Sequence, residues 1–132
     1  MNLDELRLSP TPAHALVLDD EVEIGKSIER DLRSLIAVDC FQDPHLAIEA
    51  LRTQEYSVII SDLQMPKMSG IDFMKAVGKF PDLNKVPIVM ITASGTEDNK
   101  KQAYDVNPNL AGYVVKPYKP ENLIDLIRSL LK

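Results

Sequence analysis

Five short apolar segments alternate along the chain with longer stretches whose apolar residues recur every three or four positions. The apolar segments cover residues 15–18, 37–41, 57–60, 87–91 and 112–115. Segments of this length that are rich in valine and isoleucine are typical of strands buried on both faces of a parallel sheet. The stretches between them have the spacing of amphipathic helices, as at Ile24, Ile28 and Leu32. The pattern predicts an α/β fold with five parallel strands and five helices.

The predicted helices differ in how much apolar surface they carry. Asp43 and Pro44 form a helix start, because aspartate caps a helix and proline fits its first position. The last helix, within residues 123–131, has a strong apolar stripe, whereas the helix predicted at 96–106 is polar. Weakly packed elements are the ones that move most readily. The helix at 96–106 is therefore the element that we expect to move.

Length and composition indicate one domain preceded by a short arm. The chain has 132 residues, about the size of a single domain. Pro10 and Pro12 interrupt any helix before the first apolar segment. We therefore divide the chain into an arm at residues 1–13 and an α/β domain at residues 14–132. The arm has neither the basic start nor the apolar stretch of a secretory signal.

The charge balance and the cysteine content argue against several kinds of protein. Lys and Arg number 15 against 20 Asp and Glu, a net charge of −5, whereas non-specific nucleic-acid binding requires a concentrated basic surface. The apolar segments are too short to span a membrane. A single cysteine, Cys40, excludes an internal disulfide and a cysteine-rich zinc site. We expect a cytoplasmic domain that binds neither nucleic acid nor membranes directly, with Cys40 as a buried structural thiol.

Polar residues with complementary chemistry stand at the ends of four of the predicted strands. These residues are Asp19, Asp20, Asp62, Thr92 and Lys116. The carboxyl ends of parallel strands meet at one edge of a sheet, and ligands of such sheets bind there. We expect the strand order 2-1-3-4-5, one of the common doubly wound orders. Because neighbouring strands lie about 4.8 Å apart, this order brings the three carboxylates within several ångströms of one another.

Three close carboxylates need protonation or a cation to offset their repulsion. An oxygen-rich site with few ligands suits Mg²⁺, which completes its shell with water and phosphate oxygens. Lys116 lies two strands from Asp62, about 10 Å away by the same spacing, and its long side chain can bridge that gap to a phosphate oxygen. A carboxylate can act as a nucleophile and form an aspartyl phosphate. The strand ends therefore indicate capture of a phosphoryl group on an aspartate.

Four motifs also give the chain a resemblance to a known family. They are DLQMPKMSG at 62–70, VLDDE at 17–21, ITAS at 91–94 and YVVKPYKPENL at 113–123. Over about residues 14–132 the chain resembles the receiver domain of two-component response regulators, the CheY-like family. The resemblance implies a doubly wound, flavodoxin-like (βα)5 fold with a five-stranded sheet.

The resemblance also implies which residues bind the phosphoryl group and the metal. Asp62 corresponds to the phosphoacceptor. Asp20, Asp62 and the backbone carbonyl of Gln64 correspond to direct ligands of Mg²⁺, with Mn²⁺ as a substitute. Asp19 would hold the metal through water.

Further residues match the family's phosphate-binding and switch positions. Thr92, Lys116 and the backbone N–H of Ala93 would contact the phosphoryl group. Thr92 and Tyr113 would form the switch, in which the aromatic ring follows the threonine hydroxyl inward. The Lys116–Pro117 peptide bond is expected to be cis, an option open to prolyl bonds at small cost.

By this resemblance the chain is a signalling switch rather than a turnover enzyme. It would take a phosphoryl group from a histidine kinase or a histidine phosphotransfer protein onto Asp62, and slow self-hydrolysis would remove it. The donor histidine should belong to the partner, because His14 and His45 lie away from the strand ends and are predicted surface residues. The helix at 96–106, the fifth strand and the last helix would form the face that meets an effector or a second copy in a homodimer. Aromatic candidates for this face are Tyr104, Tyr113 and Tyr118.

Three alternatives share parts of this chemistry. A phosphatase of the haloacid-dehalogenase type would use an Asp-x-Asp motif, but Gln64 stands at the second acidic position. A degenerate receiver used for binding alone would not need the complete set of acids, threonine and lysine. A flavodoxin-like cofactor protein would need a hydroxyl- and glycine-rich phosphate loop after the first strand, where Asp19, Asp20 and Glu21 would instead repel phosphate.

Overall fold

A computed structural model describes most of the chain. The described residues are 13–83, 85–93, 97–106 and 109–131. Of the predicted arm at residues 1–13, all but Ala13 lies outside the described residues. Among the described residues, no helix combines the length and the apolar character needed to cross a membrane.

The chain folds into a five-stranded parallel sheet with five helices, as the hydrophobic pattern predicted. The strands are β1 (His14–Leu18), β2 (Ala37–Phe41), β3 (Val58–Asp62), β4 (Ile88–Thr92) and β5 (Leu110–Val115). The helices are α2 (Val22–Leu32), α3 (Pro44–Thr53), α4 (Gly70–Gly78), α5 (Glu97–Val106) and α6 (Pro120–Leu130). The strand order is β2-β1-β3-β4-β5, which confirms the predicted doubly wound topology.

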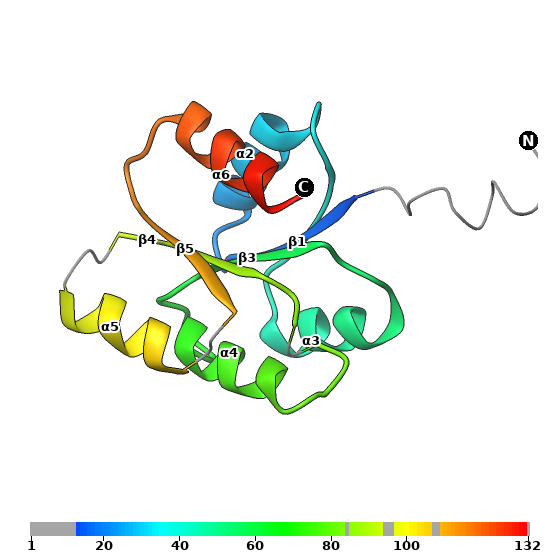
Figure 1. Ribbon diagram of the computed structural model, residues 1–132, viewed down its shortest axis with the longest axis vertical. Coiled ribbons are helices and arrows are strands. Elements are labelled where there is room, and N and C mark those ends of the chain that lie inside the picture. The colour runs from blue at the N-terminus through cyan, green and yellow to red at the C-terminus, as the bar shows by residue number, and fades with distance from the viewer. Residues whose placement is uncertain (1–12, 84, 94–96, 107–108, 132) are drawn as a thin grey trace, which may run out of the picture.

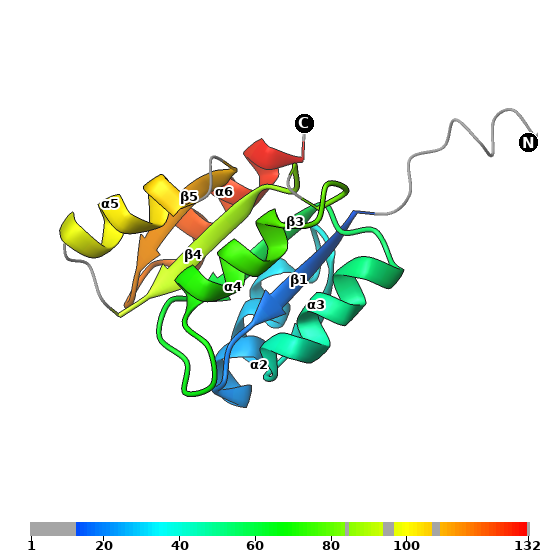
Figure 2. The ribbon, with the colours of Figure 1, turned by 90° about the horizontal axis from the view of Figure 1, so that it is seen from below.

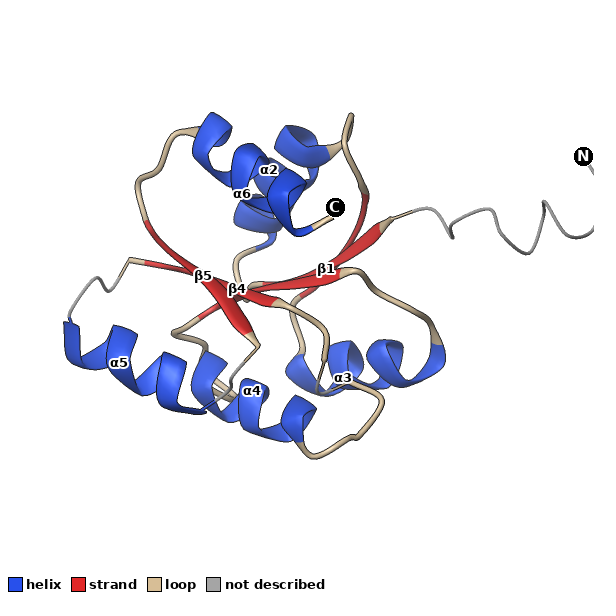
Figure 3. Ribbon diagram, in the orientation of Figure 1, coloured by secondary structure: helices blue, strands red, loops and turns tan. Residues whose placement is uncertain are grey.

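The sheet lies between two layers of helices. Helices α2 and α6 cover one face, and α3, α4 and α5 cover the other (Figures 1 and 3). Alternate residues of each central strand point to opposite faces, as the two-residue period of a strand requires. In β1, Leu16 and Leu18 join the core beneath α3, α4 and α5, whereas Ala15 and Val17 join the core beneath α2 and α6. This double burial explains why the central strands are apolar at almost every position.

Burial on both faces holds for the three central strands but is wrong for the two edge strands. In β3 and β4 every residue is buried, and in β1 every residue after His14 is buried. Edge strand β2 has no buried residue, and β5 is exposed at Ala111 and Val115. An edge strand has a neighbouring strand on one side only, so solvent reaches its outer side. For the same reason Cys40 in β2 is partly exposed rather than buried, and its Sγ lies 3.3 Å from the carbonyl oxygen of Gly25.

Side-chain caps fix where two of the helices begin. The Asp43 carboxylate accepts a hydrogen bond from the His45 N–H, with Pro44 at the first position of α3, as the sequence predicted. The Ser69 hydroxyl accepts a hydrogen bond from the Asp72 N–H and begins α4 directly after the loop that follows β3. Both helices therefore start at the carboxyl edge of the sheet.

Helix α5 is held by few apolar contacts, in line with its polar sequence. Ala103 is fully buried and Val106 is partly buried against the core, whereas Tyr104 is 43% exposed. Tyr113 packs on the same side of the sheet as α5, but Tyr118 packs on the opposite side with α2 and α6. Because the predicted partner face includes α6 as well as α5, the place of Tyr118 in that face stays a prediction. The chain turns after β5 toward the other layer before Tyr118 is reached.

His14 is also more than a surface residue. It is the first residue of β1, its side chain is 30% exposed, and its Nε2 lies 2.9 Å from Asp39 Oδ2 on the neighbouring strand β2. Its ring lies 5.1 Å from the ring of Tyr56, measured between centroids. The pairing of β1 with β2 creates this contact, which no local sequence signal reveals.

Candidate functional site

Three carboxylates meet where β1 and β3 end. Asp19 and Asp20 follow β1 directly, and Asp62 is the last residue of β3. These strands are neighbours in the sheet (Figure 2), and their register pairs Leu18 with Ser61, one position before each acid. One oxygen of each of the three carboxylates lies within 4.8 Å of the others. Asp19 is 3% exposed and Asp62 is 8% exposed, while Asp20 faces solvent.

Lys116 brings a positive charge to this cluster from the end of β5. Its Nζ lies 3.5 Å from Asp19 Oδ2 and 3.6 Å from Asp62 Oδ2. Its backbone N–H donates a 2.8 Å hydrogen bond to the carbonyl oxygen of Thr92, and the Lys116–Pro117 peptide bond is cis. The long side chain thus crosses the strand between β5 and β3, as the strand spacing predicted.

The charges at the cluster do not balance among the described residues. Burial raises the pKa of Asp19, and the neighbouring carboxylates of Asp62 and Asp20 raise it further. The backbone N–H of Glu21, 2.9 Å from Asp19 Oδ1, and the ammonium of Lys116 oppose that rise. One ammonium facing three carboxylates leaves negative charge that a cation can offset. The residues fit Mg²⁺, which prefers carboxylate oxygens and keeps part of its water shell.

The loop between β3 and α4 folds tightly back on the end of β3. The Gln64 N–H donates a 3.3 Å hydrogen bond to Asp62 Oδ1, and the Gly70 N–H donates a 2.7 Å bond to the carbonyl oxygen of Leu63. A Cβ atom on Gly70 would overlap the carbonyl oxygen of Asp62 and lie 2.9 Å from Leu63 Cα. Gly70 therefore lets α4 start against the end of β3. The short loop between them keeps Gln64 next to the acid cluster.

Strand register places the other predicted residues beside the cluster. Thr92 is the last residue of β4 and is fully buried; its predecessor Ile91 pairs with Asp62. Ala93 follows and is exposed. Tyr113 pairs with Met90, two positions before Thr92, and is partly buried in the layer of α4 and α5. The roles of Thr92, Ala93 and Tyr113 toward a phosphoryl group stay predictions.

Sequence analysis missed one ion pair near the cluster. Lys67, in the loop after β3, places its Nζ 3.4 Å from Oδ2 of Asp43, the residue that caps α3. The two residues are 24 positions apart, and an isolated lysine and aspartate at that separation give no sequence signal. A hollow of about 260 Å³ lies between this pair and Asp20.

Comparison with known families decides what this arrangement belongs to. The model of the response regulator receiver domain matches residues 15–128. The chain belongs to this family. This match confirms the resemblance seen in the four motifs. Receiver domains are the signalling switches of two-component systems.

Similar proteins of known sequence are regulators that are longer than this chain. The transcriptional regulatory protein ResD of Bacillus subtilis is 30% identical over 118 residues, covering 89% of this chain and 47% of ResD. The probable transcriptional regulator ycf29 of Porphyra purpurea is 27% identical over 117 residues, covering 88% of this chain and 55% of that protein. The chain therefore spans about half the length of these relatives.

Solved structures of the family superpose closely on the fold. The chemotaxis response regulator CheY4 of Vibrio cholerae has 30% sequence identity and a TM-score of 0.82, and the match covers 91% of this chain and 99% of CheY4. The receiver domain of the Francisella response regulator 1452 has 26% identity and a TM-score of 0.80, covering 91% of this chain and 96% of that domain. A receiver domain thus accounts for nearly the whole described fold.

Proposed function

We propose that this receiver accepts a phosphoryl group on Asp62 from a histidine kinase or a histidine phosphotransfer protein. The observation that carries the proposal is the cluster itself: Asp19, Asp20 and Asp62 have oxygens within 4.8 Å, and Lys116 Nζ lies within 3.6 Å of two of the three carboxylates. Phosphoryl transfer requires mainly positioning and charge neutralisation, and this cluster offers both.

In the proposed reaction Asp62 is the nucleophile, and the neighbouring acids hold the metal that neutralises charge. An oxygen of the Asp62 carboxylate attacks phosphorus, the P–N bond to the donor histidine breaks, and the freed imidazole nitrogen takes a proton from solvent. Bound Mg²⁺ would neutralise phosphate charge; Asp20, Asp62 and the Gln64 carbonyl are its proposed direct ligands, and Asp19 its ligand through water. Mn²⁺ would serve in its place.

Phosphorylation would change the structure at the side of the sheet that carries β4 and β5, and a partner would recognise that change. The Lys116 ammonium, the Thr92 hydroxyl and the Ala93 N–H are the proposed contacts to the phosphoryl oxygens. Movement of Thr92 would let Tyr113 repack beneath α5, which is held by few apolar contacts. The face formed by α5, β5 and α6 would then change, and we propose it as the surface for an effector or for a homodimer. Tyr104 on α5 and Val115 on β5 are 43% and 42% exposed, and they offer apolar surface to such a partner.

We propose a switch that loses its phosphate slowly rather than an enzyme with turnover. A phosphatase built on this cluster would need a general acid two positions after Asp62, where the neutral and exposed Gln64 stands. Histidine kinases present their phosphoryl groups in the cytoplasm, so we propose the same compartment for this receiver.

Phosphorylation by a small donor tests the proposal. Incubation with acetyl phosphate and Mg²⁺ should add one phosphate, detected by mass spectrometry of the intact chain, and chelation of Mg²⁺ should prevent it. Asp62→Asn should abolish the addition. Asp72→Asn, which changes an exposed acid in the first turn of α4, is the matched control and should behave as the parent does. Uptake of phosphate by Asp62→Asn at the parent's rate would overturn the proposal.

A further inference from the structure

The connection between β2 and α3, residues 42–43, lies between the two loops that carry the proposed metal ligands. On one side, the Asp19 N–H donates a 3.0 Å hydrogen bond to the carbonyl oxygen of Phe41, the last residue of β2. On the other side, Asp43 forms its ion pair with Lys67 in the loop between β3 and α4. The end of β2 therefore contacts the loop after β1, and the connection that follows it contacts the loop after β3.

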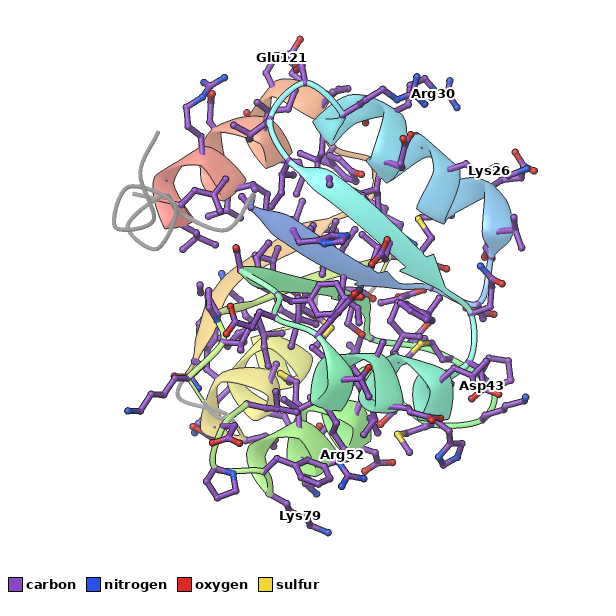
Figure 4. The ribbon with its side chains drawn as sticks, turned by 90° about the vertical axis from the view of Figure 1, so that its right-hand side faces the viewer. Lys26, Arg30, Asp43, Arg52, Lys79 and Glu121 are labelled. Carbon is purple, nitrogen blue, oxygen red and sulfur yellow. The ribbon has the colours of Figure 1, made fainter. Side chains whose placement is uncertain are left out.

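Asp43 is held in place independently of Lys67. Its Oδ1 accepts a 2.9 Å hydrogen bond from the His45 N–H at the start of α3, and its Oδ2 faces Lys67 Nζ at 3.4 Å. Figure 4 shows Asp43 where the chain enters α3. The His45 N–H, followed by Lys67, lowers the pKa of Asp43, so its carboxylate stays charged. One carboxylate thus caps α3 with one oxygen and holds Lys67 with the other.

Lys67 gives the middle of the loop between β3 and α4 an ionic contact, in addition to the packing of Met65 and Met68 against the core. Near its two ends the loop is held by hydrogen bonds from the Gln64 and Gly70 N–H groups, to Asp62 and Leu63 respectively. The Asp43–Lys67 pair adds an anchor between these ends. The hollow next to it is lined by Asp20 as well as by Asp43, Met65 and Lys67, so the pair borders the space beside a proposed metal ligand.

We propose that Asp43 and Lys67 are a positioning pair that holds the loop of Gln64 in the arrangement that binds Mg²⁺. The inference rests on the proposed function, because it concerns the same metal site. The two side chains are 31% and 67% exposed, and exposed ion pairs have modest effects. We therefore expect the pair to change Mg²⁺ affinity by about two- to fivefold.

Net charge alone also changes the affinity for Mg²⁺, and the test must separate this effect from positioning. Removing the charge of Lys67 reduces repulsion of the metal, and removing the charge of Asp43 reduces attraction. Such separate charge effects add in a double variant. Loss of a shared ion pair does not add, because either single substitution already removes it.

A double-mutant cycle of Asp43→Asn and Lys67→Met measures the difference, with Mg²⁺ dissociation constants obtained by calorimetry or NMR titration. Asparagine can still cap α3, so the helix start is kept. Each single substitution changes the Mg²⁺ dissociation constant by a certain factor. The product of the two factors should exceed the change measured in the double variant by about two- to fivefold. Lys67→Arg should keep the parent's affinity, and the free energy of unfolding should show no matching change.

An ion pair remote from the acids is the control. Arg33 Nη2 lies 2.7 Å from Glu29 Oε2 on α2, with similar exposure of 70% and 32%. In a cycle of Glu29→Gln and Arg33→Met, the effects of the two substitutions on the free energy of Mg²⁺ binding should be additive. Additive effects in the Asp43–Lys67 cycle, or equal coupling in the control, would overturn the positioning role while leaving the proposed function intact. Absence of Mg²⁺ binding by the parent chain would overturn both.

Discussion

At the scale of single residues, Lys116 holds an ammonium group against carboxylates from two different strands. Its Nζ lies 3.5 Å from Asp19 Oδ2 and 3.6 Å from Asp62 Oδ2, and its side chain is 21% exposed. The ammonium offsets part of the repulsion between the acids. It also repels any divalent cation that binds the same acids. The same charge therefore opposes metal binding and favours the arrival of an anionic phosphoryl group.

Lys116→Met should consequently change two measurements in opposite directions. A charge within about 4–6 Å changes the free energy of an ionised group by roughly one pKa unit or more, so Mg²⁺ should bind about tenfold more tightly. Phosphorylation by acetyl phosphate at saturating Mg²⁺ should become at least about tenfold slower, because the variant lacks the ammonium that is the proposed contact to the phosphoryl group. Lys79→Met, at the far end of α4, should alter neither value.

Weaker Mg²⁺ binding together with slower phosphorylation of Lys116→Met would contradict this account. That result would mean that Lys116 serves chiefly to hold Asp19 and Asp62 in place. The tenfold gain in affinity is the discriminating observation.

Which residues could be predicted from the sequence depends on whether chain order or strand pairing brings them together. Asp20, Asp62 and Lys116 each stand at the end of a strand, and every parallel strand ends at the same edge, so their meeting follows from the pattern. Asp39 stands within an apolar segment, and its contacts to Gln54 and Tyr56 span 15 and 17 positions. Those contacts depend on the register of β2, which no local signal specifies.

Asp39 Oδ2 accepts hydrogen bonds from Tyr56 Oη at 2.7 Å and Gln54 Nε2 at 2.9 Å, and lies 2.9 Å from His14 Nε2. Burial alone would raise the pKa of Asp39, but these three contacts together hold it below its usual value. Burial, reinforced by Asp39, raises the pKa of Tyr56 from 10 to about 12. The phenol therefore keeps its proton in the folded chain at pH values where it would lose it in the unfolded chain.

This difference predicts a loss of stability in alkaline solution. Since the pKa is higher in the folded state, the contribution of Tyr56 is complete below pH 10 and disappears as the pH rises toward about 12. Urea unfolding followed by circular dichroism should show the parent losing stability more steeply above pH 10 than Tyr56→Phe. At pH 7 the variant should be less stable by about 1 kcal/mol. Tyr104→Phe, at an exposed tyrosine, should follow the parent, and equal slopes for all three chains would refute the assignment.

At the scale of elements, the start of α4 matters as much as the strand that precedes it. Figure 2 shows α4 between α3 and α5 across one face of the sheet. Its first residue, Gly70, leaves no room for a side chain against the backbone of Asp62 and Leu63, and Met90 Sδ would lie 3.0 Å from an added Cβ. No described glycine has a positive φ, so Gly70 is required here for space rather than for backbone conformation. The motif at 62–70 indicated this glycine, but the contact that demands it could be seen only in the packed elements.

Gly70→Ala should therefore disturb both stability and the metal site. Two of the atoms that meet the added Cβ belong to the backbone and cannot rotate away, so the loop between β3 and α4 must shift. We expect a loss of about 1–3 kcal/mol in the free energy of unfolding, the usual cost of overpacking, together with weaker Mg²⁺ binding. Gly112→Ala is the comparison, because its Cβ would meet the flexible Leu126 side chain, 2.6 Å from Cδ2. It should cost less stability and leave Mg²⁺ affinity unchanged.

At the scale of the whole molecule, two polar centres occupy opposite ends of the sheet. The acids stand at the carboxyl end of β1, and His14 begins β1 at the other end, beside Asp39 and Tyr56. A rise of about 3.3 Å per residue separates the ends of this five-residue strand by about 13 Å. Substitutions that far apart and without shared partners usually have additive effects on stability. The centre around Asp39 should thus set the baseline stability, and the acid cluster should set its dependence on Mg²⁺.

Stability measured with and without metal tests this separation. A ligand that binds the folded chain adds RT ln(1 + [L]/Kd), so Mg²⁺ at ten times its dissociation constant should stabilise the parent by about 1.4 kcal/mol. Asp20→Asn should largely lose this increment, because it removes a proposed ligand. Tyr56→Phe should start from a lower stability yet gain the same increment, because its site lies at the other end of the sheet. An increment that falls in Tyr56→Phe as far as in Asp20→Asn would show that the two centres are coupled through the strands. An increment of zero in the parent would remove the acid cluster as a Mg²⁺ site.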